Sequence, residues 1–174
     1  MTRQDLHTAL SGKMYRTTIQ ELIDWTLLSK RNFKMIMECF NVTEDKIDQR
    51  AAWVMSEVLL QQPGWVTPYW NGMLEAIQND KRHPAVRRNV FRAWQEMRLP
   101  DEVLGPALEC IFPVVRDPQQ DIAVRAFGLT ILTNACLIYP DLVAEVILVI
   151  EDMLPYASSG LKNRCLKMLK KIST

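Results

Sequence analysis

The chain has 174 residues, of which 48% are apolar and 24% are charged, and its formal net charge is +1. This balance is ordinary for a globular protein, and it excludes a strong overall attraction to nucleic acid or anionic lipid. The longest apolar run, from Leu142 to Ile150, is interrupted by Glu145 and is much shorter than the about 20 residues that a membrane span needs. No apolar signal segment is found after Met1.

Helical periodicity dominates the sequence, and strand signals are nearly absent. In chain order, helices are expected near residues 3–11, 18–28, 31–40, 44–61, 65–79, 84–98, 101–115, 119–138, 140–155 and 159–172. Pro84, Pro118 and Pro140 stand where three of these helices are expected to begin, a position that tolerates a missing N–H. Thr18, three residues before Glu21, predicts a capping box at the second helix.

An arginine recurs along the chain at nearly constant spacing. Arg50, Arg87 and Arg125 are 37 and then 38 residues apart, and each occupies the same point of a helical pattern. Apolar positions keep the same offset in both helices of each predicted pair, as in the two columns Trp70, Leu108, Val146 and Val54, Phe91, Leu129, Leu166. A period of this size predicts stacked helix pairs.

The two ends of the chain depart from the repeat. Residues 1–41 keep no clear repeat phase and are expected to form N-terminal cap helices, whereas residues 44–172 hold the recognisable repeats. The last predicted helix, 159–172, carries several basic residues and suits a C-terminal cap with a polar outer face. Because no linker or low-complexity segment interrupts the pattern, residues 1–174 are predicted to form a single domain.

The repeated residues resemble the signature of the HEAT-repeat, or armadillo-like, family. An aspartate precedes a Val-Arg pair in a second helix, and a proline lies inside the first helix: Asp80 with Val86-Arg87, Asp117 and Asp121 with Val124-Arg125, and Pro68 and Pro106. The resemblance covers about residues 44–172. It implies an all-α fold, a right-handed α-α superhelix of about four stacked antiparallel helix pairs with atypical terminal caps, whose second helices line a concave face.

Two interpretations of the arginine column stay open. The resemblance implies a structural ladder, in which Arg50, Arg87 and Arg125 pair with aspartates of the same or a neighbouring repeat, namely Asp48, Asp80, Asp117 or Asp121. A planar guanidinium suits that pairing because it makes paired hydrogen bonds to a carboxylate. Alternatively, the arginines face a groove that binds an acidic ligand.

A basic run in the middle of the chain is the best local signal for binding. Lys81-Arg82-His83 precedes a predicted helix N-terminus, where positive charge opposes the helix dipole and where an anion is favoured. The candidate partner-binding residues are Arg82, Arg87, Arg88 and Arg92. The alternative is a solvated loop and helix edge without a binding role.

Signatures of catalysis and of metal binding are missing from the sequence. The two histidines, His7 and His83, have no second ligand at metal-binding spacing, and the glycines form no phosphate-binding loop. The four cysteines lie among apolar neighbours and are expected to be reduced thiols of a cytoplasmic protein. We therefore expect neither a metal nor a cofactor. The tryptophans are expected to be core residues, or alternatively a stacking platform for bases.

These observations favour a non-catalytic scaffold that binds a protein or an acidic peptide, with no membrane attachment. Nucleic acid is the less favoured partner, because the chain lacks a basic excess. The alternative function is a DNA-binding or alkylated-base DNA glycosylase-like HEAT protein. Its candidate parts are Asp48, Trp53, Trp94, Arg87 and Arg125. The sequence identifies neither the partner nor the oligomeric state.

Overall fold

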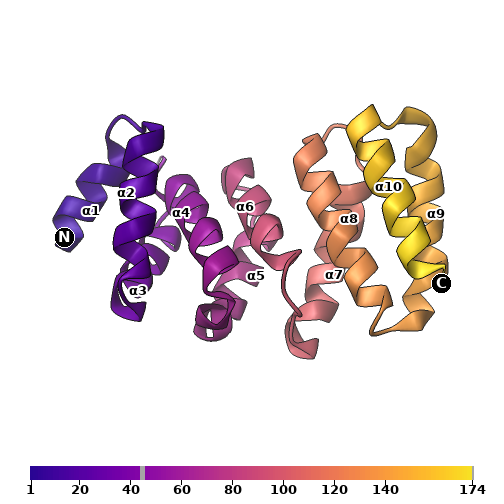
Figure 1. Cartoon of the computed structure of the whole chain (residues 1–174), viewed down its shortest axis with the longest axis horizontal. Coiled ribbons are helices and arrows are strands. Elements are labelled where there is room, and N and C mark those ends of the chain that lie inside the picture. The colour runs from indigo at the N-terminus through magenta and orange to yellow at the C-terminus, as the bar shows by residue number, and fades with distance from the viewer. Residues whose placement is uncertain (44–45, 174) are drawn as a thin grey trace. The chain divides into compact units, whose positions relative to one another are not determined.

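The computed structural model describes residues 1–43 and 46–173, and every regular element in these ranges is a helix (Figure 1). The prediction of an all-α helical repeat is therefore confirmed. The α-helices are α1 (Arg3–Ser11), α2 (Arg16–Leu27), α3 (Lys30–Phe40), α4 (Ile47–Gln61), α5 (Trp70–Gln78), α6 (Pro84–Trp94), α7 (Asp101–Arg116), α8 (Ile122–Cys136), α9 (Val143–Met153) and α10 (Ser159–Ile172). Short 3-10 helices are η1 (Pro63–Tyr69), η2 (Pro140–Leu142) and η3 (Leu154–Tyr156).

The chain divides into two compact units. The first is Met1–Ala93 and the second is Trp94–Thr174. In the first unit, α3 packs along α4, and α2 packs against both of these helices. In the second unit, α7 and α10 both pack against α8, and α9 packs against α10. The single domain predicted for residues 1–174 stays a prediction.

The repeated apolar columns form much of the core in each unit. Val54, Phe91 and Leu129 are fully buried, whereas Leu166, which the same column contains, is 50% exposed. In α10 the buried positions are Leu161, Cys165 and Met168, a helical spacing that directs Leu166 away from the core. The apolar column of the repeat therefore slips by one residue in the last helix.

Two of the expected helices are shorter in the structure. The helix expected at 65–79 is split, because Pro68 lies in the 3-10 helix η1 and α5 begins only at Trp70. The helix expected at 84–98 ends at Trp94, and residues 95–97 form a turn and a bend before Pro100.

Other differences between the expected and observed helices lie at the helix starts. The start expected at Pro118 is wrong, because Asp117 instead holds a turn that delays α8 until Ile122. The capping box expected at Thr18 is also wrong, since α2 begins at Arg16 and Tyr15 precedes it without a side-chain cap. The start expected at 44 lies outside the described residues, and α4 begins at Ile47.

Candidate functional site

Two arginines of the repeated column hold the end of the preceding helix. Arg87 donates from Nε and Nη2 to the carbonyl oxygen of Ile77, at 3.3 and 3.1 Å, and its Nη2 lies 2.7 Å from Asp80 Oδ1. Arg125 donates from Nε to the carbonyl oxygen of Val115 at 3.0 Å. Both carbonyls belong to the last turn of a helix, where no helical N–H is available and a cation interacts favourably with the helix dipole.

Arg50 also donates to carbonyl oxygens at the end of a helix, but this helix lies farther back in the sequence. Its Nη1 donates to the carbonyl oxygen of Gly12 at 2.7 Å and to that of Leu10, at the end of α1. The three arginines therefore share backbone carbonyls as their partners. The aspartate pairing implied by the family resemblance occurs at Arg87, through Asp80.

Arg82, the first of the predicted partner-binding residues, lies inside the first unit. Its Nε and Nη2 are both 3.4 Å from Asp48 Oδ2, its Nη2 donates to the carbonyl oxygen of Phe40, and its guanidinium lies 4.6 Å from the centre of the Phe40 ring. The side chains of Arg82 and Asp48 are only 7% and 8% exposed. Arg82 is thus committed to contacts between α3 and α4.

The remaining basic candidates differ in whether the guanidinium group has a hydrogen-bond or ion-pair partner. Arg87 is held as described above, and Arg92 donates from Nη1 to Glu57 Oε1 at 2.6 Å. Arg88 is exposed, and no hydrogen-bond or ion-pair partner is found for it within residues 1–43 and 46–173. A role for these residues in partner binding stays a prediction, and only Arg88 among them presents an unpaired charge in the described structure.

The candidate parts of a DNA-processing site have other contacts. Asp48 is buried against Arg82, and Trp94 is fully buried, so its indole presents no face for stacking on a base. Trp53 is 37% exposed, and its Nε1 donates to Glu57 Oε1 at 3.3 Å. Asp48, Trp53 and Trp94 therefore each make contacts within their own unit.

Three further features concern the potential metal ligands, the thiols and the apolar helices of the described residues. No three His, Cys, Asp or Glu side chains in this part of the chain are grouped so that they could hold a metal ion. All four cysteines are free thiols, and burial raises the pKa of Cys136 and Cys165. No helix of the described chain has both the length and the apolar character needed to cross a membrane.

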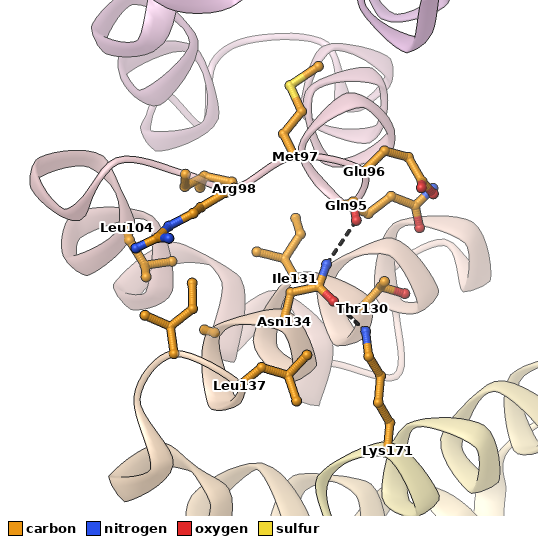
Figure 2. Close-up of a pocket in the computed structure, with 13 residues that line it drawn as sticks. Gln95, Glu96, Met97, Arg98, Leu104, Thr130, Ile131, Asn134, Leu137 and Lys171 are labelled. Carbon is orange, nitrogen blue, oxygen red and sulfur yellow. Dashed lines mark hydrogen bonds between the residues drawn. The ribbon is translucent and has the colours of Figure 1, made fainter.

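A pocket of about 460 Å³ lies within the second unit, and Figure 2 shows its lining. We call it the Asn134 pocket. It is lined by the turn after α6, the start of α7, the C-terminal part of α8 and Lys171 of α10. Its floor includes the buried side chains of Leu99, Leu104 and Ile131. Leu137, at the edge, is 56% exposed.

Asn134 is fixed at the centre of this pocket by two hydrogen bonds, both drawn in Figure 2. Its Nδ2 donates to the backbone oxygen of Gln95 at 2.9 Å, and its Oδ1 accepts from Lys171 Nζ at 2.8 Å. The side-chain Oε1 of Gln95 is buried and accepts no hydrogen bond from the described residues. Buried polar atoms are rarely left without a partner, so this oxygen is an exception within the described residues.

No motif in the sequence indicates this pocket. Its polar residues come from three separate segments, and their spacing follows no motif: Gln95, Glu96, Arg98, Thr130, Asn134 and Lys171. The one available signal was the apolar run Leu137-Ile138-Tyr139 at the end of a helix, and all three of these residues are exposed. An apolar floor with a few polar groups at the rim is typical of ligand-binding pockets.

Comparisons with known proteins agree with this architecture. A family model described as a HEAT repeat domain matches residues 6–172, which includes most of the segment predicted to cap the repeats. The crystal structure of an engineered protein from a structural genomics consortium has a similar fold, with a TM-score of 0.59 and 17% identity. That alignment covers 98% of this chain and 72% of the other. No curated protein matches the sequence.

Proposed function

This chain belongs to the HEAT-repeat family, and we propose on that basis that it is a non-catalytic interaction module that binds an extended segment of a partner protein in the Asn134 pocket. HEAT repeats form helical scaffolds that are typically used for protein interaction. The observation that carries the proposal is the combination of an apolar floor with polar groups that converge on Asn134. A volume of about 460 Å³ accommodates one or two side chains of a bound segment.

The polar groups of the pocket suit a peptide backbone. An extended segment presents N–H groups, and a change of rotamer at Gln95 would let its Oε1, which has no partner, accept from one of them. An apolar side chain of the segment would cover Leu137 and contact Ile131 on the floor. Such anchoring by a few buried side chains supplies most of the affinity in many interfaces.

The charges at the rim favour an acidic segment. Arg98 and Lys171 are both exposed there, and Glu96 is the opposing charge. These rim residues carry two positive charges and one negative charge, and rim charges steer association more than they determine affinity. We therefore propose a partner segment that places a carboxylate beside Lys171.

A displayed peptide library tests the proposal with a matched pair of surface variants. Leu137 and Leu148 are 56% and 59% exposed, but only Leu137 lines the pocket. Peptides selected on the wild type should bind Leu137→Asp about tenfold more weakly, because an anchor contact is lost, and should bind Leu148→Asp unchanged. Equal binding to both variants would contradict the proposal.

A second measurement separates this function from DNA binding. Fluorescence anisotropy with duplex DNA at low salt should show no saturable binding by the wild type. Phosphate contacts dominate affinity under these conditions. Tight binding that weakens steeply with added salt would favour the DNA-binding alternative instead.

A further inference from the structure

A second cavity of about 460 Å³ lies elsewhere in the second unit, at the ends of α7 and α9 and beside α8. We call it the Arg125 cavity. Val149 and Met153 contribute apolar walls, and both are buried. Arg116 and Asp152 lie among the lining residues, and Tyr156 is 89% exposed.

The guanidinium of Arg125 lacks the acidic partner that the repeat provides at the equivalent position. Arg87 has Asp80 at 2.7 Å in addition to its backbone carbonyl. Arg125 is only 9% exposed, and its hydrogen bond goes from Nε to the carbonyl oxygen of Val115. No carboxylate oxygen of residues 1–43 or 46–173 lies within ion-pair distance of it. A buried charge without a carboxylate partner is costly.

Pro118 stands 38 residues after Asp80, the spacing that also separates Arg87 from Arg125, so no aspartate occupies the equivalent position. The neighbouring aspartate, Asp117, makes other contacts. Asp117 Oδ1 accepts from the backbone N–H of Gln119 at 2.9 Å, and its Oδ2 accepts from Gln120 Nε2 at 2.9 Å. These bonds, first that of Gln120 and then that of Gln119, lower the pKa of Asp117, and the charge of Arg125 contributes less. Asp117 therefore holds the turn before α8 rather than neutralising Arg125.

We propose that the Arg125 cavity binds the carboxylate of a glutamate side chain from a protein partner, in the place that Asp80 occupies beside Arg87. The Nη groups of a guanidinium are suited to a carboxylate, and such charge-assisted hydrogen bonds are among the strongest in proteins. This site is separate from the Asn134 pocket and does not depend on the function proposed for that pocket.

The surroundings of Arg125 fit a glutamate that has apolar neighbours. Val149 and Met153 can contact its methylene groups, and the exposed Tyr156 ring offers a surface for a flanking apolar residue. Arg116 adds a second positive charge, although it is also 3.1 Å from Glu145. Asp152 is the one lining residue whose charge opposes an anion.

Methyl NMR of the full chain tests the proposal directly, with the Met153 ε-methyl group as the reporter. The probes are the peptides Ac-Leu-Glu-Leu-NH2 and Ac-Leu-Gln-Leu-NH2, together with sodium acetate. The glutamate peptide should shift the Met153 signal saturably and bind at least about tenfold more tightly than the glutamine peptide, since the bonds to a charged group are lost in the latter. Acetate should bind more weakly than the peptide, because it buries little apolar surface.

Three variants complete the test. Arg125→Gln should reduce binding of the glutamate peptide about tenfold, whereas Arg87→Gln removes the equivalent arginine of the first unit and should leave binding unchanged. Asp152→Asn, an exposed substitution that does not threaten the fold, should tighten binding about twofold or more by removing a repelling charge. Equal binding of the two peptides, acetate binding as tightly as the glutamate peptide, or an unchanged affinity in Asp152→Asn would overturn the proposal.

Discussion

Replacing Arg82 with methionine separates a structural role from the binding role predicted for this residue. The substitution keeps an unbranched side chain over the Phe40 ring but removes the guanidinium. Asp48, whose side chain is 8% exposed, would then keep its charge without Arg82, while its Oδ1 still accepts from the Gln49 N–H. The carbonyl oxygen of Phe40 would lose its donor as well.

The structure gives the size of the effect. Removing one partner of a buried ion pair costs about 3–5 kcal/mol, because the other charge stays buried. The two nitrogen–oxygen distances of 3.4 Å are long for hydrogen bonds, which argues for the lower end, near about 3 kcal/mol. That is a large part of the about 5–15 kcal/mol by which a typical domain is stable.

Urea unfolding followed by circular dichroism measures the loss of free energy, and hydrogen exchange in α3 locates it. Arg88→Met is the matched control, since Arg88 is exposed and should change stability by less than about 0.5 kcal/mol. The double variant Asp48→Asn/Arg82→Met should recover most of the loss, because no buried charge remains. If Arg82→Met is as stable as Arg88→Met, the argument for a structural Arg82 is refuted.

Two further predictions concern titratable groups. Burial raises the pKa of the Cys136 and Cys165 thiols, so iodoacetamide at pH 8 should modify the half-buried Cys39 and Cys110 first. Mass spectrometry after partial alkylation measures the order, and earlier modification of Cys136 or Cys165 would contradict this reasoning. The Thr2 backbone N–H and then its hydroxyl lower the pKa of Asp5 below its ordinary value of 3.8. Thr2 and Asp5 form a capping box at the start of α1, in which the Thr2 N–H donates to Asp5 Oδ2 at 2.8 Å and the Asp5 N–H donates to Thr2 Oγ1 at 3.2 Å. The stabilisation of α1 by this capping box should therefore be complete above the ordinary pKa of Asp5 and be lost as the pH falls through the lower folded value. An NMR titration in which Asp5 shows no lowered pKa would contradict this.

The helices were predictable from the sequence because their signals are local. The helices expected at 3–11 and 159–172 match α1 and α10. The errors arose where a side chain competes with the helix for backbone groups, as Asp117 does before α8. Hydrophobic periodicity does not reveal such hydrogen bonds, because they depend on the conformation of a single carboxylate side chain.

The contacts of the site residues were less predictable. The column of Arg50, Arg87 and Arg125 is visible at once, but a one-dimensional pattern does not show that their partners are mainly carbonyl oxygens. Arg82 and Arg88 both occur in one basic segment, yet one is buried and the other is exposed. Burial of a long polar side chain is decided by tertiary packing, which brings Asp48 to Arg82 across 34 residues.

The arginine–carbonyl bonds also constrain how the length of this chain can vary. Arg87 and Arg125 each reach a carbonyl ten residues earlier. An insertion inside either ten-residue interval would move the guanidinium away from its acceptor and leave the end of a helix without its donor. Tolerated insertions and deletions should therefore collect outside these intervals, at exposed connections where no such bond depends on the spacing.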